Sequence, residues 1–180
     1  MYSFAQRSDT RVYDEPLYAH YLSRTSARFY HPGAEEVLRS QEQNGEKVVR
    51  ELLLGPNPHP VLFFKNMTHH LVELDWDFLM HLKNVILTRD PREMLPSYAK
   101  QVEEPSLRDT GYAGQVEILE FLDSRGCTPL VLDAGELLLN PWKVLAQLCD
   151  RLGIEFQEEM LEWKAGPRPE DGVWARYWYE

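Results

Sequence analysis

The stretch that decides the fold is NVILTRDPREMLPSYAK, residues 84–100. Its first part is a run of apolar residues, and this continuous hydrophobicity is typical of a strand that is buried on both faces of a parallel sheet. Arg89 follows the run, and Asp90-Pro91 comes next. Because proline suits the first turn of a helix, we expect a helix to begin there. The stretch therefore predicts a strand that passes directly into a helix, which is the repeating unit of α/β proteins.

Three other segments have the same apolar character and are bounded by turn residues: RVYDEP at 11–16, PVLFFKN at 60–66 and TPLVLDA at 128–134. Helical patterns follow the strands, as expected for a parallel sheet covered by helices. At 180 residues the chain has the length of one compact domain. We predict a single domain over residues 1–180, with a three-layer α/β/α architecture around a parallel sheet.

Two helices can be predicted with their ends. One is expected at 141–152, where Asn140 can cap, Pro141 takes the first helical position and Gly153 follows the last turn. The other is expected at 111–125, with Val116, Leu119 and Leu122 facing the core and Gly126 at its C-terminal cap.

Charge and composition exclude several classes of function. The formal net charge of −10 argues against nucleic-acid binding, which needs a clustered basic face. The longest apolar runs, such as VLFF, fall far short of the roughly 20 residues that span a bilayer. The two cysteines, Cys127 and Cys149, have no CxxC spacing that would indicate a zinc cluster. We expect a cytoplasmic protein with no nucleic-acid and no membrane partner.

Arg89 and Ser97, eight residues apart, form a candidate anion site. Ligands of parallel sheets bind beyond the carboxyl ends of strands, so a strand-end arginine and a serine in the next helix can converge on one anion. The guanidinium offers a planar fork to phosphate oxygens, and the hydroxyl adds a directional donor. In the alternative interpretation, Arg89 pairs with Asp90 or a neighbouring carboxylate and Ser97 is an ordinary helix-surface residue. The residues by themselves leave both open.

The segment TRDPREMLPSY at 88–98 resembles the 3′-phosphate-binding motif of sulfotransferases that use 3′-phosphoadenosine 5′-phosphosulfate (PAPS). DEPLYAHYL at 14–22 and FFKNMTHHL at 63–71 are similar to other segments of that family. The tail WKAGPRPEDGVWARYWY at 163–179 is similar to that of a bacterial and plant sulfotransferase-like group, some members of which are fused to aminotransferase-like modules. The resemblance spans nearly the whole chain.

The resemblance implies a fold, a donor and partners. It implies the P-loop nucleoside triphosphate hydrolase-like fold, with PAPS as sulfonate donor and a small hydroxylated molecule as acceptor. Arg89 and Ser97 would bind the 3′-phosphate, and Lys164 and Arg168 would lie over the nucleotide. The expected protein partners are a second copy of the chain or a fused aminotransferase-like module.

The family's first strand and its Gly/Ser/Thr-rich loop, which holds the 5′-phosphosulfate, have no counterpart in this sequence. MYSFAQR at 1–7 resembles the helix that follows the loop. The expected fold therefore lacks its first strand. A second hypothesis stays open, in which the chain is a catalytically inactive sulfotransferase-like fragment that acts as a binding or partner module.

Sulfonate transfer needs a base for the acceptor hydroxyl and positive charge on the oxygen that leaves sulfur. Glu15 ends a predicted strand, and the resemblance implies a role as base or in contact with the acceptor. His69 or His70 is an alternative base, and Lys65 is the candidate for stabilising the leaving oxygen. Each also has an ordinary structural interpretation: Glu15 as a loop acid and Lys65 as a strand-end charge that reaches solvent.

A metal site is the competing interpretation of one segment. His69, Glu73, Asp77 and His81 recur every four residues and would share one face of a helix. The apolar residues Leu71, Leu74, Phe78 and Leu82 would form the buried stripe of the same helix. The polar series is then the solvated side of that helix, and we predict no metal.

Overall fold

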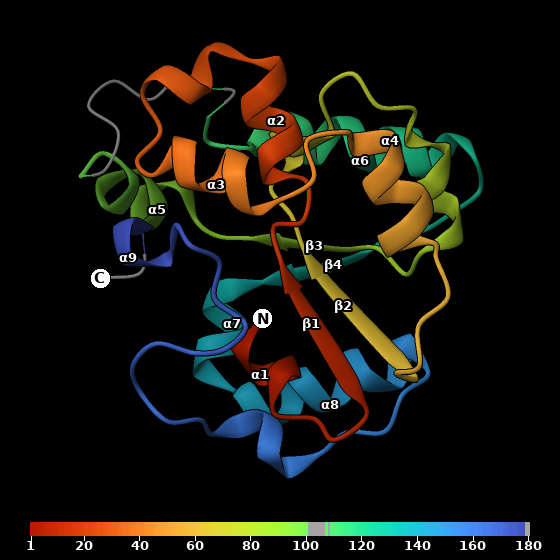
Figure 1. Ribbon diagram of the computed structural model, residues 1–180. Helices are drawn as coiled ribbons and strands as arrows, with labels where there is room; N and C mark the ends of the chain where they lie inside the picture. Colours follow the sequence, from red (N-terminus) through yellow and green to blue (C-terminus); the bar gives the residue numbers. More distant parts are fainter. Residues whose placement is uncertain (101–106, 108, 179–180) are drawn as a thin grey trace. The chain divides into compact units, whose positions relative to one another are not determined.

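The structure, a computed structural model, describes residues 1–100, 107 and 109–178, except for the side chain of Ser97 (Figure 1). Contacts within the chain separate into two compact units. The first unit contains Met1–Asp75 and the C-terminal segment from Glu162, and the second contains Trp76–Leu161. Each unit is described by itself below.

The first unit is built around a pair of strands. Its elements are α1 (Tyr2–Ala5), β1 (Thr10–Asp14), α2 (Tyr18–Arg24), the 3₁₀ turn η1 (Ser26–Phe29), α3 (Ala34–Ser40), α4 (Gly45–Val48), the π-helical turn η2 (Val49–Leu53), β2 (Val61–Lys65), the 3₁₀ turn η3 (Thr68–Leu71) and α9 (Ala175–Trp178). β1 and β2 pair in parallel, with Thr10 opposite Val61 and Asp14 opposite Lys65. The carboxyl ends of both strands therefore lie side by side at the same end of this sheet.

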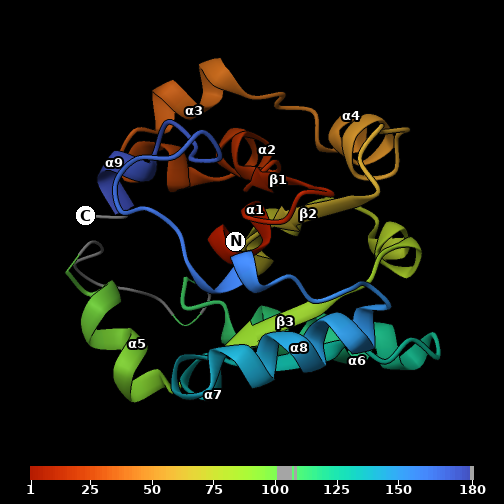
Figure 2. The same ribbon diagram turned by 90° about the horizontal axis from the view of Figure 1, so that it is seen from below.

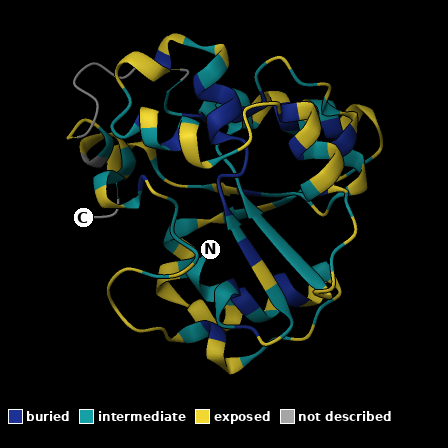
Figure 3. Ribbon diagram, viewed as in Figure 1, coloured by how far each residue is buried: buried dark blue, intermediate teal, exposed yellow. Residues whose placement is uncertain are grey.

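The core of the first unit lies beyond the carboxyl ends of these strands, around α2. Tyr18, Leu22, Val37 and Trp174 are buried there together, and most of α2 is buried (Figure 3). Trp174 comes from the C-terminal segment and is 2% exposed. This segment is thus an integral part of the first unit, because burial of a large aromatic ring contributes strongly to stability.

The second unit has its own pair of strands. Its elements are the 3₁₀ turn η4 (Trp76–His81), β3 (Val85–Thr88), α5 (Pro91–Tyr98), α6 (Tyr112–Ser124), β4 (Leu130–Asp133), α7 (Ala134–Leu139), α8 (Pro141–Leu152) and the 3₁₀ turn η5 (Glu158–Leu161). β3 and β4 are parallel, with Val85 opposite Leu130 and Thr88 opposite Asp133. Figures 1 and 2 show α6 and α8 on opposite sides of this pair.

All four predicted strands are confirmed. In the described residues they form two two-stranded parallel sheets, β1–β2 and β3–β4. The coarse prediction of an α/β chain with parallel strands and helices is therefore correct.

The helix predicted at 141–152 is confirmed, and it begins and ends at the expected residues. Pro141 occupies its first turn, and Gly153 ends it in the left-handed region with φ 74°. Asn140 stands at the N-cap position but forms no side-chain cap hydrogen bond. Instead, its carbonyl accepts from the N–H of Val144 at 3.0 Å.

The helix predicted at 111–125 forms as α6, and Gly126 follows it with φ 72°. Its inward face is partly different from the prediction. Val116 is 52% exposed, whereas Ile118 and Leu122 are buried. The prediction that Val116 faces the core was therefore wrong, because the helix directs the face with Ile118 and Leu122 to the core.

The continuous helix expected through 69–82 is absent. The segment contains two separate 3₁₀ turns, Thr68–Leu71 and Trp76–His81. Between them Glu73 has φ 54°, a backbone conformation that breaks a right-handed helix. His69, Glu73, Asp77 and His81 accordingly do not share a helix face, and the described residues hold no group of three His, Cys, Asp or Glu placed to bind a metal.

In the described part of the chain, no helix has the length and apolarity needed to cross a membrane.

Candidate functional site

Three charged side chains meet at the carboxyl ends of β1 and β2. The Lys65 ammonium lies 3.2 Å from Asp14 Oδ1 and also contacts Glu15 Oε1. The Asp14 and Glu15 side chains are only 1% and 9% exposed, whereas that of Lys65 is 28% exposed. The parallel register places Asp14 directly opposite Lys65, which explains why these charges meet. We call Asp14, Glu15 and Lys65 the strand-end cluster.

The backbone at Glu15 is held in an unusual conformation. Its φ of 46° lies in the left-handed region, which a residue other than glycine rarely adopts. Three hydrogen bonds fix it there: the Glu15 N–H donates to the Lys65 carbonyl at 2.7 Å, and the Glu15 carbonyl accepts from the Tyr18 N–H and the Gln41 side chain. Such strain persists where surrounding contacts overdetermine it, and it is common at functional sites.

Burial sets the acidity of Glu15. It raises the pKa of the carboxyl group above its ordinary value, although the charge of Lys65 and the hydrogen bond from it act in the opposite direction. A carboxylate with a raised pKa is a stronger base than an exposed one. The side chain is therefore suited to accept a proton.

The two predicted histidines follow β2 in the turn Thr68–Leu71. His70 is 1% exposed, and its ring stacks on that of Tyr18 with centroids 5.0 Å apart. His69 is half-buried, and its ring lies 4.7 Å from that of Tyr21. Burial, together with the electrostatic influence of the neighbouring His69 and Lys65, holds the pKa of His70 well below its ordinary value. His70 is therefore a neutral imidazole inside the core of the first unit.

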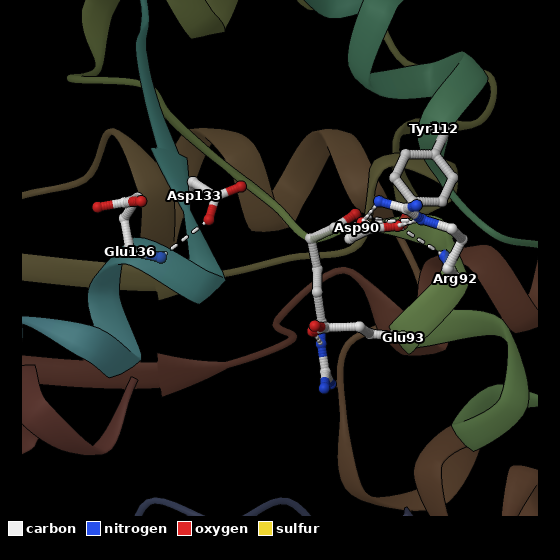
Figure 4. Close-up of polar contacts among 7 residues, drawn as sticks. Asp90, Arg92, Glu93, Tyr112, Asp133 and Glu136 are labelled. Carbon is white, nitrogen blue, oxygen red and sulfur yellow. Dashed lines mark hydrogen bonds and ion pairs between the residues drawn. The ribbon is translucent and has the colours of Figure 1, made fainter.

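In the second unit, Arg89 follows β3 and precedes α5. Figure 4 shows the neighbouring side chains of Asp90, Arg92 and Glu93. Its side chain is 45% exposed, and its Nε lies 3.3 Å from Glu93 Oε2, one helical turn further on. Its carbonyl accepts a 2.6 Å hydrogen bond from the Tyr112 hydroxyl, which fixes the backbone at this point. Ser97 lies on α5, but its side chain is outside the described part of the structure.

Asp90 explains why α5 begins where it does. Its Oδ1 accepts from the Arg92 N–H at 2.9 Å, and its carbonyl accepts from the N–H groups of Glu93 and Met94. The Arg92 side chain adds an ion pair at 2.6 Å. These hydrogen bonds, above all that from the Arg92 side chain, lower the pKa of Asp90 to about 2. Asp90 therefore pairs with Arg92 and not with Arg89.

The two predicted basic residues of the C-terminal segment lie around one hollow of about 450 Å³. Gln6, Glu162, Trp163, Lys164 and Arg168 line it. The Arg168 guanidinium pairs with Glu170 at 3.3 Å and lies over the ring of Tyr2. Lys164 is exposed. The hollow thus combines positive charge with the half-exposed indole of Trp163.

The structure brings together some of the predicted site residues. Glu15 contacts Lys65, and the rings of His69 and His70 are neighbours with centroids 4.9 Å apart. Sequence reasoning missed Asp14, although its position beside Glu15 at a strand end was a usable signal. It also missed Gln41, because no spacing in the sequence connects that residue to Glu15, 26 positions away.

Comparisons with known proteins give a consistent result. A family model described as "Sulfotransferase domain" matches residues 1–180. Branched-chain-amino-acid aminotransferase-like protein 1 of Arabidopsis thaliana is 45% identical over 181 residues, which make up 100% of this chain and 32% of that protein. Branched-chain-amino-acid aminotransferase-like protein 2 of the same plant is 42% identical, with the same coverage.

The chain spans about a third of the length of these curated relatives. No solved structure matches it. The resemblance drawn from the TRDPREMLPSY segment is confirmed, since the family model covers every residue from 1 to 180. The chain belongs to the sulfotransferase domain family.

Proposed function

We propose that this domain binds the 3′-phosphoadenosine part of PAPS and, in a complete form, takes part in sulfonate transfer to a small hydroxylated acceptor. The three-layer P-loop-like architecture is part of the same proposal. Membership of the sulfotransferase family supports it. Arg89 is the candidate residue for nucleotide binding, and the strand-end cluster provides the candidate residues for sulfonate transfer.

The observation that best supports nucleotide binding is the position of Arg89. It stands between β3 and α5, where ligands of parallel α/β folds bind. Its only ion pair in the described residues is the exposed one with Glu93. Exposed pairs of this kind contribute little free energy, so a phosphate can replace the carboxylate. The guanidinium therefore fits a phosphate group, and we propose Ser97 as a second ligand of the same phosphate.

The chemistry at the strand-end cluster follows from its charges. PAPS supplies the sulfonate group when it is bound. Glu15 accepts the proton of the acceptor hydroxyl, because its raised pKa makes it a stronger base than an ordinary exposed carboxylate. The Lys65 ammonium, held by Asp14 and Glu15, supplies positive charge near negative charge that develops on oxygen. The cluster thus combines a base and a fixed cation.

We assign the proton transfer to Glu15 and not to a histidine. His70 is enclosed by aromatic rings and 1% exposed, so an acceptor hydroxyl reaches it poorly. We propose that it positions Tyr18 through ring stacking. His69, which is half-buried, remains the alternative base.

We also propose an aminotransferase-like module as a protein partner. The printed names of the relatives and the two thirds of their length that lie outside the match support it. Self-association of the domain remains a prediction.

Replacing Arg89 tests the proposed nucleotide binding. Arg89→Ala should weaken the binding of adenosine 3′,5′-bisphosphate by about 1.5–3 kcal/mol, the usual contribution of a charge-assisted hydrogen bond. Isothermal titration calorimetry measures this change. Arg125→Ala is the matched control, because Arg125 is 46% exposed and pairs with Asp77 in the same unit. If both variants bind the nucleotide like the unchanged protein, Arg89 is not a phosphate ligand, and the inactive-module hypothesis gains support.

A further inference from the structure

A second cavity lies in the first unit, on the side of β1 away from β2. Its volume is about 320 Å³. It is lined by Arg11, Val12, Tyr13, Asp14, Pro16, Gln41, Glu42, Val48, Leu52, Pro169 and Glu170. The lining contains four consecutive residues of β1 and none of β2, and in the described part of the chain β1 pairs with β2 alone, so we place the cavity at the edge of β1 that faces away from β2. Its size is at the lower end of the range for small-molecule sites, about 300–1,000 Å³.

The charged residues of this cavity are of both signs. Arg11 is exposed, and in the described residues it forms no ion pair but only a cation–π contact with Tyr13. Glu42 and Glu170 line the same space. Each of them already pairs with a cation, at Lys47 and Arg168 respectively. A carboxylate has lone pairs for several donors, so these pairs leave room for one more ammonium group.

The remaining lining is apolar. Val12 and Val48 are buried, Leu52 is partly buried, and Pro16 is buried beside them. These side chains form a surface that suits a short aliphatic group.

The backbone of β1 adds polar groups to the cavity. The Asp9 carbonyl accepts from the Val61 N–H, and the Glu15 N–H donates to the Lys65 carbonyl, so odd-numbered residues face β2. Alternate residues of a strand direct their backbone groups to opposite edges. The N–H and C=O of Val12 therefore point to the open edge, where one can donate to a carboxylate and the other can accept from an ammonium.

From this combination we infer that the cavity binds a free aliphatic α-amino acid as its zwitterion. The guanidinium of Arg11 would bind the carboxylate, because arginine matches the planar geometry of that group. The acidic side of the cavity would bind the ammonium group, and the apolar side chain would lie on Val12, Val48 and Leu52. This site does not depend on the proposed transfer of sulfonate.

Three ligands of the same shape test the inference by calorimetry: L-leucine, 4-methylpentanoate and 3-methylbutylamine. Each of the last two lacks one charge of the amino acid. L-Leucine should bind more tightly than either by about tenfold or more, because each charged group adds a charge-assisted hydrogen bond. If 3-methylbutylamine or 4-methylpentanoate binds as tightly as L-leucine, or if none of the three binds, the inference is wrong.

Two substitutions locate the binding. Arg11→Met should weaken L-leucine binding about tenfold or more, and Leu52→Trp should abolish it by filling the cavity. Arg28→Met is the matched control for the first, because exposed Arg28 also lies over an aromatic ring, that of Phe29. Leu54→Trp is the control for the second, since Leu54 is 43% exposed and lies outside the lining. Circular dichroism shows whether each variant is folded, and folded cavity variants that bind L-leucine as the controls do would overturn the inference.

Discussion

Replacing Lys65 by methionine should lower the free energy of unfolding by about 3–5 kcal/mol at neutral pH, the usual cost of removing one partner of a buried ion pair. The Lys65 ammonium is the cation that both buried carboxylates of the strand-end cluster contact. Without it, Asp14 and Glu15 would carry two negative charges side by side with little access to water. The folded state would bear this electrostatic cost, whereas the unfolded chain would not.

The pH dependence of this variant has a defined sign. In Lys65→Met the folded-state pKa of Glu15 should lie further above its unfolded value, because burial raises this pKa and the lysine that lowers it is gone. Stability is then present below the unfolded pKa, about 4, and is lost as the pH rises through the raised folded value. Acidification should therefore restore part of the lost stability.

Urea unfolding followed by circular dichroism measures both effects. Lys47→Met is the matched control, because Lys47 pairs with Glu42 at 2.7 Å on the surface. Exposed pairs contribute little, so the control should change stability far less. A loss in Lys65→Met no larger than in Lys47→Met would show that the strand-end cluster does not depend on the lysine.

In a complete form of the protein, which contains the loop for the 5′-phosphosulfate, Glu15→Gln should lower the rate of sulfonate transfer about 10²- to 10⁴-fold, the usual contribution of a general base. Glutamine has nearly the same shape as glutamate, but it cannot accept a proton from the acceptor hydroxyl. For the unchanged protein, the rate should fall on acidification through the raised pKa of Glu15, because the protonated carboxyl is no longer a base. This acid limb of the pH profile should disappear in the variant.

Transfer of labelled sulfonate from PAPS to a panel of phenols, sugars and alcohols measures the rate. Glu73→Gln is the matched control, because Glu73 shares the left-handed backbone of Glu15, with φ 54° against 46°. Its side chain is 61% exposed and pairs only loosely with Arg24, at 3.8 Å. The control should keep the full rate. Equal rates for both variants would remove Glu15 from the mechanism and leave His69 as the candidate base.

The sequence predicted the strands well because each is a continuous apolar run between turn residues. The clearest case is the run at Val85–Thr88, which forms β3 as expected. Helix ends could also be predicted where proline and glycine stand at positions with fixed backbone demands, as at Pro141 and Gly153.

The segment between β2 and β3 could not be predicted in the same way. The four-residue recurrence from His69 to His81 is compatible with a helix, but periodicity contains no information on the positive φ of Glu73. The strand-end cluster was predicted in part: Glu15 and Lys65 were identified from their places at the carboxyl ends of predicted strands. Asp14 and Gln41 were not, because their contacts depend on strand register and on a side chain that returns from a distant loop.

The most direct test of the proposed function compares two nucleotides in calorimetric titrations of the same protein preparation. Adenosine 3′,5′-bisphosphate should bind at least about tenfold more tightly than adenosine 5′-phosphate, because only the former offers Arg89 a 3′-phosphate for a charge-assisted hydrogen bond. Equal affinity for the two nucleotides, or no binding of either, would contradict the proposal that this sulfotransferase domain binds the 3′-phosphoadenosine part of PAPS.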